Sequence, residues 1–219
     1  MRLTSYQIGQ FKTEGYVVVP DLIPASILKQ VQAEYADLLD GLYEGWFADG
    51  LVQAPGANLD FWGKLLSAYQ AGCDYFQPMD ISLPGDRIMD DTPFHIGPAV
   101  FEMLTAAPLL DAVEQLIGPE LTSNPIQHVR LKPPAAKLDQ AEVRAHITAT
   151  DWHQDRAVAL EDADQTDMVT VWLAITDATV ENGCLQVQPQ ASGQTILPHC
   201  ARTQTGIADG FVDETKALP

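Results

Sequence analysis

Cysteine is scarce in this chain of 219 residues, which has only Cys73, Cys184 and Cys200. The three are odd in number, widely spaced and form no Cys-x-x-Cys pair. This pattern argues against a disulfide framework and against a zinc site made of thiolates, because both need paired cysteines at short, regular spacing. We therefore expect three reduced thiols in a protein of the cytoplasm.

Basic residues are also few: 12 lysines and arginines stand against 30 aspartates and glutamates, and the net charge is -18. A surface this acidic repels the phosphates of nucleic acids and of anionic lipids, so neither is an expected partner. No apolar run approaches the length of a membrane span, and the N-terminal residues lack the apolar centre of a secretory signal. The apolar fraction of 46% is ordinary for a globular protein, so we expect one domain over residues 1–219.

The front part of this domain, residues 1–118, carries helical patterns. Thr4 and Gln7 form a capping-box pattern at the start of a first helix, and Gly15 is its expected end. A second helix is expected from near Pro24 to about Leu42, and residues 41–56 are expected to be irregular. The other predicted helices follow Asp60 as far as Tyr69, cover residues 99–104, and cover residues 108–117, between a first-turn Pro108 and a terminal Gly118.

The back part, residues 119–219, is expected to be rich in strands. The predicted strands cover residues 121–123, 126–132, 168–175 and 184–188, and one short strand, residues 16–19, lies in the front part. Residues 168–175 alternate strictly and are apolar on both faces, which predicts a strand covered on both sides. Glu181-Asn182-Gly183 is a turn signal between the last two strands. The sequence thus predicts an α+β fold built on a β-sandwich or jelly roll.

A His-x-Asp motif, His153-Gln154-Asp155, precedes the long predicted strand. On a strand, side chains two residues apart point to the same side, so the imidazole and the carboxylate would converge. With a second histidine they would form the two-His-one-carboxylate triad that holds Fe(II) and leaves three positions open. The alternative from spacing alone is a surface histidine hydrogen-bonded to a nearby carboxylate, since His-x-Asp is a short and unspecific motif.

The surroundings of this motif add a resemblance. Trp152-His153-Gln154-Asp155, followed by residues 169–175 and by Glu181-Asn182-Gly183-Cys184-Leu185, resembles the phytanoyl-CoA dioxygenase family. The opening from Phe11 to Val19, Lys132-Pro133-Pro134 and Leu197-Pro198-His199 are similar to other segments of that family. The combination of WHQD with ENGCL at this spacing is much more specific than His-x-Asp alone.

The resemblance implies an Fe(II)- and 2-oxoglutarate-dependent oxygenase on a double-stranded β-helix, with the N-terminal helices packed on it. It implies that His153 and Asp155 bind the iron, and that O2 and 2-oxoglutarate are used to hydroxylate an aliphatic C–H group of a small organic substrate. Because Asp155 is present, hydroxylation is expected rather than halogenation. The resemblance also assigns His128 and Trp172 to the 2-oxoglutarate pocket. Gln154, between the two ligands, is expected to support them without contacting the iron. The alternatives are a hydrogen-bonded strand residue for His128 and plain strand core for Trp172.

The chain departs from the family in two places. The family has a distal histidine and then an arginine that pairs with 2-oxoglutarate, and no residue here matches either one. His199 is one candidate for the third ligand, but it follows Asp155 by only 44 residues (199 minus 155) and its surroundings match a different family segment. The favoured alternative for His199 is a polar residue near the mouth of the pocket. Arg130, Arg156 and Arg202 are the candidates for the arginine, although none has the expected context. The second departure is Pro189-Gln190-Ala191-Ser192-Gly193, where the family usually shows Pro-Gly-Ser-His.

Two expectations follow from the first departure. One is that the β-helix is incomplete at the C-terminus, so that the chain is a truncated piece of a longer enzyme or is completed by a partner chain. The other is a different function: a degenerate, non-catalytic β-helix that binds a ligand or a partner without turnover. The sequence leaves the substrate and the oligomeric state open.

Overall fold

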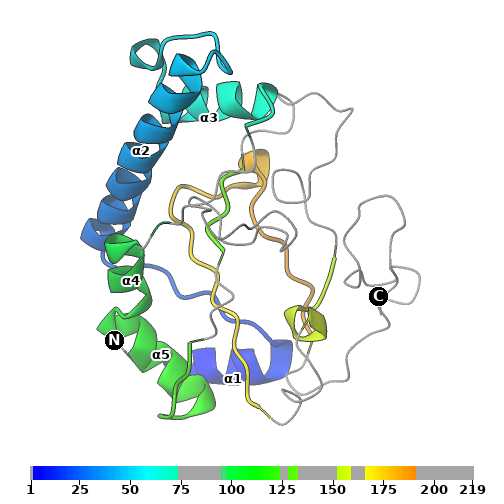
Figure 1. Cartoon of the computed structure of the whole chain (residues 1–219). Coiled ribbons are helices and arrows are strands. Elements are labelled where there is room, and N and C mark those ends of the chain that lie inside the picture. Colours follow the sequence, from blue (N-terminus) through cyan, green and yellow to red (C-terminus); the bar gives the residue numbers. More distant parts are fainter. Residues whose placement is uncertain are drawn as a thin grey trace. The chain divides into compact units, whose positions relative to one another are not determined.

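The computed structural model describes residues 2–73, 95, 97–123, 128–132, 152–158 and 166–190 (Figure 1). The chain divides into two compact units. The first unit consists of Met1–Leu22, Ala106–Thr122 and Ala149–Pro219, and the second of Ile23–Thr105 and Ser123–Thr148. Each unit is described by itself below.

The first unit begins with helix α1 (Ser5–Glu14), and its two ends confirm the predicted signals. The Thr4 hydroxyl accepts the Gln7 backbone N–H at 3.2 Å, and the Gln7 side chain accepts the Thr4 N–H at 2.9 Å. These bonds complete the capping box and satisfy N–H groups that a helix N-terminus otherwise leaves unpaired. Gly15 ends the helix in the left-handed conformation, with φ of 77°. Only glycine adopts this conformation without a steric cost.

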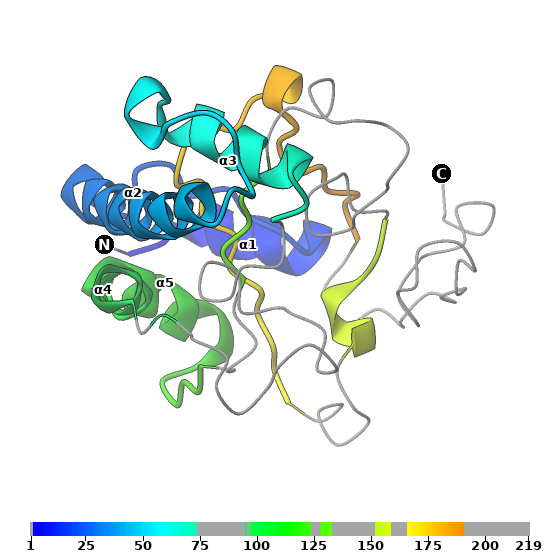
Figure 2. The same cartoon turned by 45° about the horizontal axis from the view of Figure 1, so that its top comes forward.

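Helix α5 (Ala107–Ile117) belongs to the same unit and lies beside α1 in both views (Figures 1 and 2). It has proline in its first turn and Gly118 at its end, with φ of 97°, as the sequence predicted. Leu109 and Ala112 are buried on its inner face. Their spacing of three residues places them on one side of the helix, so α5 contributes an apolar stripe to the core of this unit.

The second unit is organised around the long helix α2 (Ala25–Ala48). Its buried side chains are Val31, Tyr35, Leu39 and Tyr43, which recur every four residues and form one stripe. Helices α3 (Phe61–Gln70) and α4 (Pro98–Leu104) and the short helix η1 (Gly56–Asn58) pack against α2 (Figure 2).

The predicted end of α2 is wrong by six residues, because the helix continues past Leu42 and through Gly45 to Ala48. Tyr43 supplies the physical reason. Its ring is 1% exposed, and its hydroxyl lies 3.0 Å from both the Ala54 carbonyl and the Ser67 hydroxyl. Burial of an aromatic ring in a satisfied site outweighs the ~1 kcal/mol that each helical glycine costs relative to alanine.

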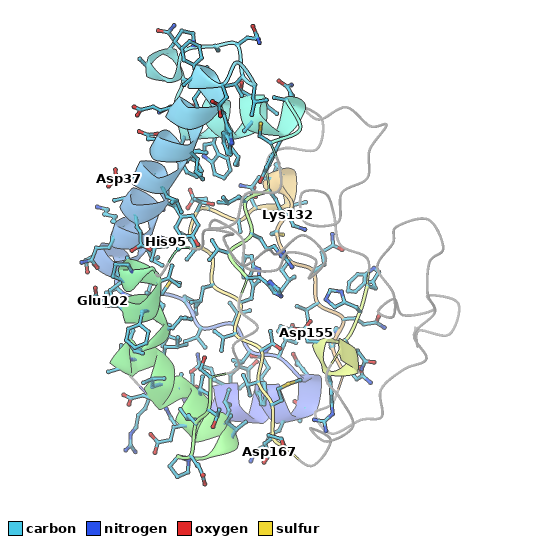
Figure 3. All side chains as sticks on the ribbon, in the orientation of Figure 1. Asp37, His95, Glu102, Lys132, Asp155 and Asp167 are labelled. Carbon is cyan, nitrogen blue, oxygen red and sulfur yellow. The ribbon has the colours of Figure 1, made fainter. Side chains whose placement is uncertain are left out.

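Two carboxylates cap the shorter helices of this unit. Asp60 accepts the Gly63 N–H at 2.7 Å, which confirms the predicted start of α3. Helix α4 has no side-chain cap of its own, and Glu34 of α2 supplies one by accepting the Ala99 N–H at 2.8 Å. The other oxygen of Glu34 lies 3.1 Å from Nε2 of His95, without the alignment of a hydrogen bond (Figure 3). Glu34 therefore joins α2 to the start of α4.

The described residues contain no β-strand, so the predicted strands within them are not formed as paired strands. A strand is defined by its ladder to a neighbour, and residues 16–19, 121–123, 168–175 and 184–188 make none there. The predicted strand 126–132 begins outside the described residues, and its described part, residues 128–132, forms no ladder. The predicted alternation of residues 168–175 is visible only in part in their exposure. Val169, Leu173 and Ile175 are half-buried, whereas Val171 of the same predicted face is exposed, as are Met168 and Trp172 of the other. The expectation of cover on both faces is wrong.

No helix within the described part of the chain combines the length and the apolar character needed to cross a membrane.

Candidate functional site

The His-x-Asp motif lies in the first unit, at the start of the short helix η4 (Asp155–Val158) and not on a strand. The strand assumed for it is thus corrected, but the two side chains still converge. Nε2 of His153 lies 3.2 Å from Oδ1 of Asp155, and the two side chains are 35% and 48% exposed (Figure 3 labels Asp155). The two side chains thus converge at the start of a short helix, and the period of two in a strand, on which the sequence prediction was based, is not the cause.

This separation suits two ligands of one ion. Donors bound at about 2.1 Å on adjacent corners of an octahedral ion lie about 3 Å apart. An imidazole nitrogen and a carboxylate oxygen are also the donor types of the two-His-one-carboxylate sites that hold Fe(II). His153 and Asp155 therefore fit two neighbouring positions around a single metal ion.

A third protein ligand is not found in the part of the chain that the structure describes. No group of three or more histidine, cysteine, aspartate or glutamate side chains there could hold an ion. His199, the candidate from the sequence, lies outside the described residues, as does Arg202. Arg156 follows Asp155 directly, and its guanidinium donates a hydrogen bond to the Thr166 carbonyl at 3.3 Å.

The other predicted site residues divide between the two units. Trp172 lies in the first unit, within the described residues 166–190, and is 52% exposed. His128 and Arg130 lie in the second unit, on residues 128–132. That short segment is joined to α3 by a hydrogen bond of 2.8 Å from the Tyr69 hydroxyl to the Leu131 carbonyl.

Gln154 lies between the two donors, and its side chain turns to a different partner. Its amide nitrogen donates a hydrogen bond to Oε1 of Gln190 at 3.0 Å. Gln154 and Gln190 are both half-buried, although Trp152, His153 and Asp155 around them are exposed. A hydrogen bond that is partly shielded from water is worth more than an exposed one, because water competes less for the same groups.

Gln190 is in turn bonded to the end of α1. Its backbone N–H donates to the Glu14 carbonyl at 2.7 Å. A Cβ atom added to Gly15 would lie closer than 3.0 Å to the Gln190 carbonyl oxygen, so only glycine permits this approach. The sequence analysis missed both roles: Gly15 was interpreted only as a helix end, and Gln190 only as a departure from a family pattern. No motif in the sequence signals a contact between residues so far apart.

The turn predicted at Glu181-Asn182-Gly183 is confirmed. Residues Val180–Asn182 form the short helix η6, and Gly183 follows with φ of 82°. The Asn182 side chain accepts the Thr179 N–H and donates to the Asp177 carbonyl, both at 2.6 Å. The pKa of Glu181 is lowered by the hydrogen bond from its own backbone N–H and by one from the Thr179 side chain. Asn182 and Gly183 thus serve the turn, as expected.

A family model described as phytanoyl-CoA dioxygenase (PhyH) matches residues 11–214. The matched range includes the WHQD motif, the turn of residues 179–184 and Gln190. Comparison with the curated proteins and with the solved structures gave no match. The family match therefore rests on the sequence and not on a likeness to a solved structure.

Proposed function

The chain belongs to the phytanoyl-CoA dioxygenase family, and on that premise we propose that it is an Fe(II)- and 2-oxoglutarate-dependent dioxygenase. The proposed reaction is the hydroxylation of an aliphatic C–H group of a small organic substrate with O2. The observation that carries this proposal is the convergence of His153 and Asp155, 3.2 Å apart, inside the range that the family matches. Asp155 also favours hydroxylation over halogenation, because a carboxylate ligand fills the position that a halide would need.

His153 and Asp155 are the proposed iron ligands. Fe(II), when bound with 2-oxoglutarate and O2, would supply the oxidising power for the C–H bond. The protein itself would hold an unprotonated imidazole nitrogen and an ionised carboxylate so that both face one point. Both donors must be unprotonated because protonated donors do not bind metal. The partial exposure of both side chains leaves that point open to an ion and to the co-substrate.

The fold and the pocket complete the proposal. Family membership implies a double-stranded β-helix. We assign Trp172 and His128 to the 2-oxoglutarate pocket on the family pattern. The exposed ring of Trp172 supports this role over plain core, because a core residue would be covered.

A second function remains in competition: a β-helix protein that binds a ligand or partner without turnover. One observation favours it. The described residues hold two donors of the triad, and a triad needs three. His199 is the candidate to be tested as the third ligand, and its substitution by alanine decides whether the chain itself completes the site.

Anaerobic titration with Fe(II) and 2-oxoglutarate tests the proposal. We expect a visible charge-transfer band in the parent chain and in Asp167→Ala, which removes an exposed carboxylate of the same unit. We expect no band in His153→Ala or Asp155→Ala, and a much weaker one in His199→Ala if His199 is the third ligand. Admission of O2 should then release succinate. A parent chain without a band favours the non-catalytic function, and a band that survives in both His153→Ala and Asp155→Ala contradicts the ligand assignment.

A further inference from the structure

We propose that Gln190 is a positioning residue that joins the end of α1 to the loop carrying His153 and Asp155. This inference rests on the proposed function of that pair as metal ligands. It depends on two hydrogen bonds, one from the Gln190 backbone to the Glu14 carbonyl at 2.7 Å and one from Gln154 to the Gln190 side chain at 3.0 Å. We call these two bonds the Gln190 link.

The first bond of the Gln190 link fixes the backbone of residue 190. The last carbonyls of a helix have no partner inside the helix, and the Gln190 N–H satisfies that of Glu14. Gly15 turns the chain away with φ of 77° and leaves room for the Gln190 carbonyl. α1 is held at its other end by the Thr4 capping box, so residue 190 is attached to a helix with both ends satisfied.

The second bond, from Gln154 to the Gln190 side chain, connects the fixed residue 190 to the residue between His153 and Asp155. Residue 154 is covalently flanked by His153 and Asp155, so a bond that holds its side chain also restricts the backbone torsions on either side. Those torsions decide where the imidazole and the carboxylate point. Partners that orient ligands without touching the metal typically change metal affinity when they are removed. The Gln190 link would thus keep both donors facing one point before an ion arrives.

The Gln190 link depends on a residue of this chain that differs from the usual family pattern. Gln190 stands in the segment where the family usually shows Pro-Gly-Ser-His, and a glycine at this position would have no side chain to accept the bond from Gln154. Gln190 and Gln154 are half-buried beside exposed neighbours, which shields the bond between them. A residue that departs from the pattern is therefore the one that contacts the centre of the motif.

Two substitutions of Gln190 distinguish the effect of losing its side-chain hydrogen bond from the effect of changing its side-chain shape. Gln190→Met keeps the length of the side chain and removes the acceptor, whereas Gln190→Glu keeps an acceptor oxygen for Gln154. Gln186 is an exposed glutamine of the same segment, and Gln186→Met and Gln186→Glu are matched controls for the lost amide and for the added charge.

The first readout is the affinity of the full chain for Co(II), followed by the absorption spectrum of the bound ion. We expect Gln190→Met to weaken binding about three- to tenfold, the range set by the loss of a single hydrogen bond. Gln190→Glu should stay within about twofold of Gln186→Glu. Gln154→Met should weaken binding as Gln190→Met does, and the double variant should bind no more weakly than either one, because the same bond is already lost.

The second readout needs no metal. Hydrogen exchange of the peptide covering residues 152–158 should rise in Gln190→Met, while exchange in α5 of the same unit stays as in the parent chain. Equal increases in both places would mean that Gln190 only supports the fold of the unit, and this overturns the inference. So does a Gln190→Met variant that matches Gln186→Met in both Co(II) affinity and exchange.

The two readouts also separate this inference from the proposed function. If the parent chain binds no Co(II), the proposed metal ligands are wrong, and the exchange experiment alone decides whether the Gln190 link holds the 152–158 loop. If Co(II) binds and exchange in the loop ignores Gln190, the metal site stands and the Gln190 link is wrong.

Discussion

Substitution of Gly15 or Gly9 by alanine adds one methyl group in each case. The two glycines are six residues apart in the sequence, but their surroundings differ. Gly15 ends α1 with φ of 77°, and a Cβ there would press against the Gln190 carbonyl. Gly9 lies inside α1, and a Cβ there would meet nothing within 4 Å. The structure therefore predicts that Gly15→Ala destabilises the first unit and that Gly9→Ala stabilises it.

The magnitudes follow from these contacts. Alanine in the left-handed conformation costs about 1–2 kcal/mol. The Gln190 carbonyl is backbone and cannot rotate aside, so its segment must move and lose the bond to Glu14, worth about 1 kcal/mol. Gly15→Ala should thus lose about 2–3 kcal/mol of unfolding free energy. Gly9→Ala should gain about 0.5–1 kcal/mol, because alanine favours a helix interior over glycine.

Urea unfolding followed by far-ultraviolet circular dichroism measures both variants against the parent chain. At this size 1 kcal/mol corresponds to a shift of about 2–4 °C in melting temperature, so thermal melts provide a second estimate. Two results would refute the reasoning: a Gly15→Ala variant as stable as the parent, or a common sign for both substitutions. Either would mean that residue 190 does not approach the end of α1 as closely as the structure has it.

Further predictions concern the second unit and the 179–184 turn. Glu34→Ala should lower the unfolding free energy by about 2 kcal/mol, because it leaves the start of α4 uncapped, whereas Asp37→Ala on the exposed side of α2 should change it by less than about 0.5 kcal/mol in the same urea experiment. Asn182→Ala removes two hydrogen bonds from the turn and should raise amide exchange of residues 179–184, with no change in α1. Because the pKa of Glu181 is lowered below its ordinary 4.5, its contribution to the turn is complete above pH 4.5 and is lost as the pH falls through the lowered value. A carboxyl titration by NMR should show this lowered pKa, and Thr179→Ala should raise it towards 4.5.

Sequence alone determined the features that depend on neighbours along the chain. The capping box at Thr4, the helix ends at Gly15 and Gly118, the Asp60 cap and the Asn182-Gly183 turn were all predicted and are all present. Each results from bonds within about four residues or from the conformational freedom of glycine, so no distant contact is needed to form it. Family membership was also predicted from motifs and is confirmed by the match over residues 11–214.

Tertiary structure decided the features that depend on distant residues. Helix α2 continues past its predicted end because Tyr43 is buried, against the local preference of Gly45. His153 and Asp155 meet as the motif predicted, but at the start of the short helix η4 in place of a strand. The bonds of Gln190 to Glu14 and to Gln154 join segments more than 30 residues apart, and side-chain patterns carry no record of such a pairing. Local bonds are specified by residue type and spacing, whereas these contacts exist only once the chain has folded and brought their partners together.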